Sequence, residues 1–186
     1  MRNLLGPNFP LMADANMGWG IDQATKAVDA LSQFDLYWLE EPLIPEDLEG
    51  HERLGRESRI PIATGENLHS VHEFQHLINY GHVDFPEPDA ATLGGITPWM
   101  RVAELAQSKG LPVTSHGIHD VHVHLLAGIS NASYLEVHGF GLERFIERRI
   151  ELKEGKAIAP DTPGHGVKLD LVKLKGYREA TYSSTN

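Results

Sequence analysis

Six side chains that can act as acids, bases or metal ligands recur along the chain at nearly even intervals. They are Asp14, Glu40, Glu66, Asp89, His116 and Glu136, separated by 26, 26, 23, 27 and 20 residues. An interval of this length fits one strand followed by one helix, so the pattern predicts that each side chain ends a strand. A single acid at such a place is usually a solvated loop residue, whereas six in phase indicate one shared site.

The first three of these residues are carboxylates, with no histidine or cysteine among them. Ligands that offer only oxygen suit a hard divalent cation, so Asp14, Glu40 and Glu66 are predicted to bind Mg²⁺, with Mn²⁺ as an alternative. Glu40 belongs to the stretch WLEEP, residues 38–42, in which two glutamates are adjacent. Because successive strand residues point to opposite faces, Glu40 is expected to face the site and Glu41 to point away or to lie beyond the strand end.

Asp89 and His116 end neighbouring strands in the same pattern. A carboxylate that holds one imidazole nitrogen fixes the tautomer and raises the basicity of the other nitrogen. A buried structural pair is the alternative explanation of these two residues. Next to three predicted metal ligands, the preferred interpretation is a general base, with His116 as the base and Asp89 as its partner.

Short apolar or β-branched segments alternate with helical patterns along most of the chain. The predicted strands lie at 9–16, 35–42, 60–67, 82–90, 111–117 and 133–139, and the predicted helices at 21–34, 46–58, 70–81, 97–110 and 120–130. This alternation predicts an α/β fold of right-handed βαβ units, with the six site residues at the carboxyl ends of parallel strands, as in a (β/α)8 barrel. The expected division is a partial barrel at 1–143, short antiparallel pieces at 144–177 and a loose tail at 178–186.

Composition narrows the class of protein. The 186 residues are 41% hydrophobic, enough for one domain, or at most two, with a buried core. The net charge of −10, from 26 acidic and 16 basic residues, argues against a nucleic-acid partner and is compatible with a bound cation. There is no cysteine, signal-peptide segment or apolar run of membrane-spanning length. We therefore expect a soluble, cytoplasmic protein without disulfides or a membrane partner.

A second cluster of possible metal ligands is the stretch HDVHVH, which contains His119, Asp120, His122 and His124. It could indicate the zinc site of a metal-dependent hydrolase. The stretch follows a predicted strand and begins a predicted helix, where His119 and His122 are neighbours and His124 points elsewhere. The zinc site is therefore the less favoured interpretation.

Six short motifs together resemble the enolase superfamily, and within it the mandelate racemase subgroup, over residues 9–170. They are DAN at 14–16, WLEEP at 38–42, TGEN at 64–67, PDA at 88–90 with GGIT at 94–97, SH at 115–116 and YLE at 134–136. The resemblance implies that the three carboxylates named above are metal ligands and that the His116–Asp89 pair is the base. It further implies that Glu136 is a neutral acid that hydrogen-bonds the substrate carboxylate, with Asn16 and His138 as further substrate contacts.

The reaction that the resemblance implies is an Mg²⁺-dependent dehydration of acid sugars of the aldonate or aldarate type. The base would remove the proton α to the carboxylate, the cation would stabilise the resulting enediolate, and the β-hydroxyl would leave with a proton from His116. A racemase, epimerase or cycloisomerase of a carboxylate substrate is the alternative, and a non-catalytic truncated remnant is a third possibility. The expected partner is a small carboxylate, in a homo-oligomer if the protein is full length.

The sequence departs from the subgroup in two respects. The subgroup has a capping domain and two earlier barrel strands, the second of which carries a lysine base, so only six of eight strands and two exposed sheet edges are expected here. The segment at 144–177 would pack on the barrel or on such a capping domain. In the predicted strand 82–90, Pro86 lacks a ladder donor, so a bulge or distortion is expected there. Glu87 shares a face with Asp89 and would point inward, where an unpaired carboxylate is costly.

Overall fold

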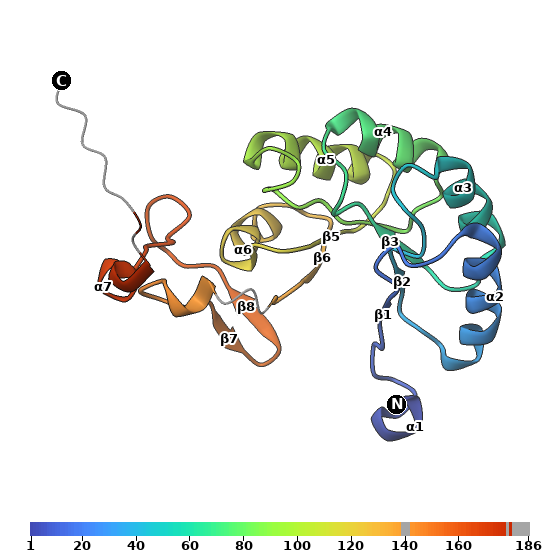
Figure 1. The fold of residues 1–186 in the computed structure, drawn as a ribbon, viewed down its shortest axis with the longest axis horizontal. Helices are drawn as coiled ribbons and strands as arrows, with labels where there is room; N and C mark the ends of the chain where they lie inside the picture. Colours follow the sequence, from blue (N-terminus) through green and yellow to red (C-terminus); the bar gives the residue numbers. More distant parts are fainter. Residues whose placement is uncertain (139–141, 178, 180–186) are drawn as a thin grey trace.

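The computed structural model describes residues 1–138, 142–177 and 179. Six short parallel strands alternate with helices along an open arc (Figure 1). The strands are β1 (Ala13–Asp14), β2 (Leu39–Glu40), β3 (Ile62–Thr64), β4 (Phe85–Pro86), β5 (Val113–Ser115) and β6 (Ala132–Leu135). Each strand overlaps the segment in which it was predicted, so the sequence pattern placed all six correctly.

The helices cover the outer, convex side of the arc (Figure 1). They are α2 (Ile21–Leu31), α3 (Leu48–Glu57), α4 (Val71–Tyr80), α5 (Ile96–Ser108) and α6 (His119–Ala127), with the short α1 (Arg2–Leu5) before β1 and the 3-10 turn η1 (Ser32–Phe34) after α2. Side-chain caps fix two of the starts, because Asp47 accepts a hydrogen bond from the Gly50 amide and Ser70 accepts one from the Glu73 amide. These caps set where α3 and α4 begin, and hence the length of the loops that precede them.

The strands form two parallel sheets. The first has the order β1-β2-β3-β4 and the second pairs β5 with β6. The register places Asp14 beside Glu40, and Thr64 beside Pro86 at the end of β4. Proline has no amide hydrogen to donate, and among the described strands β4 makes no ladder with β5. The ladder of β3 with β4 stays in register through Pro86, so the bulge expected there is not seen in this ladder, and the two sheets are separate between β4 and β5.

Two apolar clusters lie between the strands and the helices. The larger packs α4, α5 and α6 around Phe74, Trp99 and Val113, and the smaller packs α2 and α3 around Val28 and Leu54. On the inner side of the arc, the ring of Tyr134 on β6 lies 5.7 Å from that of Trp38 and 5.3 Å from that of Tyr37. These inner aromatic contacts connect the first sheet with the second, where backbone pairing is interrupted.

The carboxyl-terminal segment contains an antiparallel hairpin, as expected. Its elements are η2 (Leu142–Arg144), β7 (Glu151–Lys153), β8 (Lys156–Ile158), α7 (Leu171–Leu174) and η3 (Lys175–Tyr177). Figure 1 shows it beyond β6 and α6, at the opposite end of the arc from α1. The predicted tail at 178–186 lies outside the described residues except for Glu179. No helix in the described part of the chain is long and apolar enough to cross a membrane.

Candidate functional site

All six predicted residues lie at or just after the carboxyl ends of the strands. Asp14 and Glu40 are the last residues of β1 and β2, Glu66 follows β3, Asp89 follows β4, His116 follows β5 and Glu136 follows β6. The strands are parallel, so their carboxyl ends face the same edge of the arc (Figure 1). The sequence therefore predicted correctly which end of the fold carries the candidate site.

Three carboxylates converge there from adjacent strands. Glu40, Glu66 and Glu87 each offer an oxygen, and the three oxygens lie within 4.8 Å of one another. We call these three residues the acid cluster. Trp38, two residues before Glu40, donates a hydrogen bond from Nε1 to Glu40 Oε2 over 3.0 Å and so helps to fix the position of this carboxylate. Two of the three predicted ligands, Glu40 and Glu66, belong to this cluster, and Glu87 joins them.

The acid cluster is electrostatically unfavourable on its own. Burial, followed by the charges of Glu41 and other nearby acids, raises the pKa of Glu66 to about 7. Burial also raises the pKa of Glu40, and burial together with the charges of Glu40 and Glu66 raises that of Glu87 well above its usual range. Carboxylates this close must share protons or a cation. Because all the donors are oxygens, the set suits a hard divalent cation such as Mg²⁺.

Asp14 lies at the edge of this arrangement. Its side chain is exposed, and Oδ1 accepts a hydrogen bond from the Asn16 amide over 2.7 Å. Asn16 and Met17 have positive φ angles of 45° and 56°, so the chain turns back around the Asp14 carboxylate. The charge of Asp14 still contributes to the raised pKa values of Glu40 and Glu66. Metal binding by Asp14 and substrate contact by Asn16 stay predictions.

Glu41 lies just beyond the end of β2, which is one of the two positions expected for it. It is 1% exposed, with a φ of 38° that directs it out of the strand. Asn67 donates from Nδ2 to both Glu41 oxygens, over 3.0 and 3.2 Å, and also lies 3.3 Å from Glu66 Oε1. Glu41 is thus held beside the acid cluster by an amide. Asn67 is the asparagine of the TGEN motif, which was recognised in the sequence, but its contact with Glu41 was not predicted.

His116 connects the acid cluster to Asp89. Its Nδ1 lies 3.1 Å from Asp89 Oδ2, and its Nε2 lies 3.3 Å from Glu66 Oε2. The Ala91 amide donates to the other oxygen of Asp89 over 2.7 Å and fixes the carboxylate. Burial lowers the pKa of His116, but the hydrogen bond with Asp89 and the charges of Glu66 and Glu136 outweigh it and raise the pKa to about 9. The geometry is that of a base held by a carboxylate.

His122 supports the loop that carries Asp89. It is completely buried, and its Nε2 accepts a hydrogen bond from the Ala90 amide over 2.9 Å. The same nitrogen lies 3.8 Å from Asp89 Oδ1, and the ring lies beside that of Trp99. Burial lowers the pKa of His122 to about 4, so the ring is neutral at pH 7. This contact was missed in the sequence, where His122 was one member of a histidine-rich stretch.

The remaining residues of that stretch do not gather into a metal site among the described residues. His119 Nε2 lies 3.5 Å from the neighbouring Asp120 carboxylate, and His124 Nε2 lies 3.1 Å from the carbonyl oxygen of His165. Neither belongs to a group of three possible ligands within the part of the chain that the structure describes. The helical interpretation of HDVHVH is therefore correct, since α6 begins at His119.

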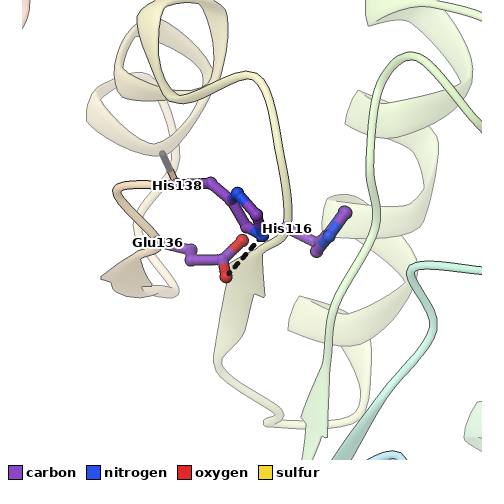
Figure 2. Close-up of side chains that lie close together, drawn as sticks. All are labelled: His116, Glu136 and His138. Atoms are coloured by element: carbon purple, nitrogen blue, oxygen red, sulfur yellow. Dashed lines mark ion pairs between the residues drawn. The ribbon is translucent and has the colours of Figure 1, made fainter. Parts of the chain in front are cut away.

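Figure 2 shows the second group of possible ligands, His116, Glu136 and His138, which we call the histidine cluster. Each offers one ligand atom, and these atoms lie within 4.8 Å of one another. The Gly117 amide donates to Glu136 Oε2 over 2.9 Å, and Glu136 Oε1 lies 4.0 Å from His138 Nε2. The rings of His116 and His138 meet edge to face, with centroids 5.6 Å apart. Glu136 and His138 are thus placed beside the base; their contact with substrate stays a prediction.

Comparison with known proteins agrees with this geometry. Residues 1–173 match the family described as enolase C-terminal domain-like. A 3,6-anhydro-alpha-L-galactonate cycloisomerase from Streptomyces coelicolor is 47% identical over 174 residues, which are 94% of this chain and 48% of that protein. An L-talarate/galactarate dehydratase from Salmonella typhimurium is 38% identical over 91% of this chain and 42% of its own length. The chain therefore spans about half the length of these relatives.

Solved structures give the same result. A racemase from Streptomyces coelicolor with bound magnesium superposes with a TM-score of 0.90 at 45% identity, over 94% of this chain and 48% of that one. An L-talarate dehydratase from Polaromonas, complexed with Mg and L-glucarate, superposes with a TM-score of 0.89 at 38% identity, over 96% of this chain and 50% of that one. The chain belongs to the enolase superfamily, in its mandelate racemase subgroup, and forms part of the carboxyl-terminal (β/α)8 barrel.

Proposed function

We propose that this chain carries the cation-binding and proton-abstracting residues of an Mg²⁺-dependent acid-sugar dehydratase. The observation that supports this most directly is the contact of 3.3 Å between Glu66 Oε2 and His116 Nε2. It places the possible cation ligands immediately beside an imidazole that Asp89 holds. A sugar acid bound through its carboxylate at the acid cluster would then present its α-hydrogen to His116.

The chemistry of the substrate explains the choice of residues. A hydrogen α to a carboxylate is a weak acid, because its removal places a second negative charge on the same group. A divalent cation, when bound, offsets that charge by several kcal/mol. Glu136, which lies beside His116, would donate a hydrogen bond to the same carboxylate.

His116 would serve in two successive steps. Because its pKa is raised to about 9, the ring must first become neutral, which requires that a bound cation offset the charge of Glu66. The neutral ring would then take the α-proton onto Nε2, while Asp89 holds the ring through Nδ1 and stabilises the imidazolium. It then gives that proton to the departing β-oxygen, which leaves as water. The same group acts as base and acid, so dehydration needs no second residue on the opposite face of the substrate.

The names of the relatives support acid-sugar chemistry at this site. One is an L-talarate/galactarate dehydratase and another is an L-rhamnonate dehydratase, at 38% and 32% identity. The Polaromonas structure contains both Mg and L-glucarate. The partner that we propose for this chain is accordingly a small sugar acid.

A cycloisomerase is the second candidate, favoured by the relative that is 47% identical to this chain. It would share the first step, in which His116 removes the α-proton. The two candidates differ in the fate of the β-oxygen, which leaves as water in a dehydration and stays in the molecule when the bond that breaks is part of a ring.

The experiment incubates the chain with Mg²⁺ and a panel of aldonates, aldarates and their lactones or anhydro forms in D₂O, with NMR detection of products. A 2-keto-3-deoxy acid formed from an open-chain aldonate or aldarate, with loss of one water, is the expected product of dehydration. Isomers without loss of water would overturn dehydration in favour of the cycloisomerase. Neither product nor α-deuteration, in a sample shown to bind Mg²⁺, would overturn both enzyme proposals and favour a non-catalytic protein.

A further inference from the structure

We propose that Glu87 is an additional oxygen ligand of the divalent cation, on the β4 side of the site. This inference rests on the cation assumed in the proposed function, and it adds a residue to the three that the sequence pattern predicted. The same pattern identified Glu87 only as an inward-pointing carboxylate in a strand that Pro86 was expected to distort. The position of Glu87 in the fold supports a specific role, that of a cation ligand.

The backbone holds Glu87 firmly against the neighbouring strand. Its amide donates to the carbonyl oxygen of Thr64 over 3.1 Å, which continues the pairing of β3 with β4 for one residue beyond Pro86. Gly65 follows Thr64 with a φ of 139°, and a Cβ there would lie 3.2 Å from the Glu87 amide nitrogen and 2.6 Å from the Phe74 ring. Only glycine permits this close approach. It brings Glu66 and Glu87 to the same point at the end of two adjacent strands.

The carboxyl of Glu87 is only partly satisfied within the protein. It shares a side-chain hydrogen bond with Glu40, another acid, and Oε2 lacks a hydrogen-bond partner among the described residues although the residue is 2% exposed. A buried polar atom without a partner is costly, and such atoms commonly mark an ion or a functional group that completes the site. Because this oxygen lies in a cluster with Glu40 and Glu66, a shared proton or a cation would satisfy it, and the cation would compensate more than one carboxylate.

One divalent cation would compensate all three carboxylates at once. Mg²⁺ prefers six oxygen ligands in octahedral geometry and is usually held by a few carboxylates together with water and substrate. The acid cluster offers oxygens from three adjacent strands, within 4.8 Å of one another. Asp14, on the edge strand β1, lies at the opposite end of the same sheet. Glu87 would thus complete the inner side of the cation site, and Asp14 would approach from the outer side.

The test measures Mn²⁺ affinity directly, from the electron paramagnetic resonance signal of free Mn²⁺ in titrations of the 186-residue chain. Glu87→Gln preserves size and removes the charge, and we expect it to weaken binding roughly tenfold or more. Glu87→Leu, which removes both oxygens, should weaken it further. The matched control is Glu41→Gln, which removes an equally buried charge beside Glu66 but outside the acid cluster. Thermal melts by circular dichroism confirm that each variant is folded.

The outcomes separate this inference from the proposed function. If Glu87→Gln weakens binding more than Glu41→Gln, Glu87 is a ligand. If the two variants have equal effects while Glu40→Gln abolishes binding, the Glu87 inference is overturned and the proposed cation site stands. If Glu40→Gln binds Mn²⁺ as the parent does, or the folded parent binds none, both proposals fail.

Discussion

The acid cluster and the histidine cluster lie side by side but are built on opposite electrostatic principles. The acid cluster ends the strands of the first sheet and consists of carboxylates alone. The histidine cluster follows β5 and β6 and combines two imidazoles with a carboxylate, with Asp89 against one of the rings. Burial, followed by neighbouring like charges, raises the pKa values of the acid cluster. Burial lowers the pKa of His116, but the hydrogen bond with Asp89 and nearby negative charges outweigh it and raise this pKa.

This difference indicates which part of the site depends on a ligand. The histidine cluster contains its own compensating charges and can keep its geometry without a bound ion. The acid cluster cannot, because its members repel one another unless a proton or a cation lies between them. The two clusters meet at the contact between Glu66 and His116, where the imidazole of one cluster compensates the charge of a carboxylate of the other.

The largest expected effect comes from replacing the base. His116→Asn retains a hydrogen-bond donor for Asp89 but removes the nitrogen that would accept the α-proton. We expect α-proton exchange in D₂O to fall by roughly 10²- to 10⁴-fold, the usual contribution of a general base. Exchange is followed by NMR with a sugar acid that the parent chain deuterates.

The same variant tests whether the two clusters are functionally separate. Mn²⁺ affinity should be retained in His116→Asn, because the acid cluster is intact. A large loss of affinity would show that the imidazole belongs to the cation site, and unchanged exchange would remove His116 from the role of base.

A smaller effect, of about 3 kcal/mol at most, is expected from His122 under acid conditions. Its pKa in the folded protein is lowered from 6.5 to about 4, so the unfolded chain takes up this proton first as the pH falls. The stability that neutral His122 contributes is therefore present above pH 6.5 and is lost as the pH falls toward 4. The raised pKa of Glu66 acts in the opposite direction, with stability present below pH 4.5 and lost as the pH rises through about 7.

His122→Gln isolates the histidine contribution from the opposing carboxylates. The amide oxygen of glutamine can accept the hydrogen bond of the Ala90 amide without titrating. Urea unfolding at pH 7.5 and pH 5 should show that the parent loses more stability on acidification than this variant does. His76→Gln, on the exposed face of α4, is the matched control. Parallel pH dependence of the parent and His122→Gln would contradict the buried, neutral state of His122.

The strand ends and the pairing of Asp89 with His116 were predictable because they follow from periodicity. One strand and one helix per 20 to 27 residues placed six side chains at one edge of the fold, and the types of residue at 89 and 116 identified a carboxylate–imidazole pair. These features depend on local sequence and on the parallel topology alone.

The membership of the acid cluster could not be predicted, because loop conformation decides it. Positive φ angles at Asn16 and Glu41 turn one carboxylate back to its own backbone and bury another against Asn67. Glu87 enters the cluster because Gly65 allows close approach of two backbones. None of these angles is visible in a pattern of alternating residues. His122 was missed for a similar reason, since its partner, the Ala90 amide, is distant in sequence.

The smallest expected effect tests the contact between the two clusters. The charge of Glu66 helps to raise the pKa of His116 to about 9, so a cation bound to Glu66 should lower it, by about one unit or 1.4 kcal/mol. Titration of the His116 ring by NMR, with Mg²⁺ and after its removal with EDTA, measures this change, and His116→Asn assigns the signal. If His116 titrates identically in both samples although Mg²⁺ is bound, Glu66 does not transmit cation binding to His116. The pKa of His116 would then be set by Asp89 and Glu136 without Glu66, and the two clusters would be neighbours without electrostatic linkage.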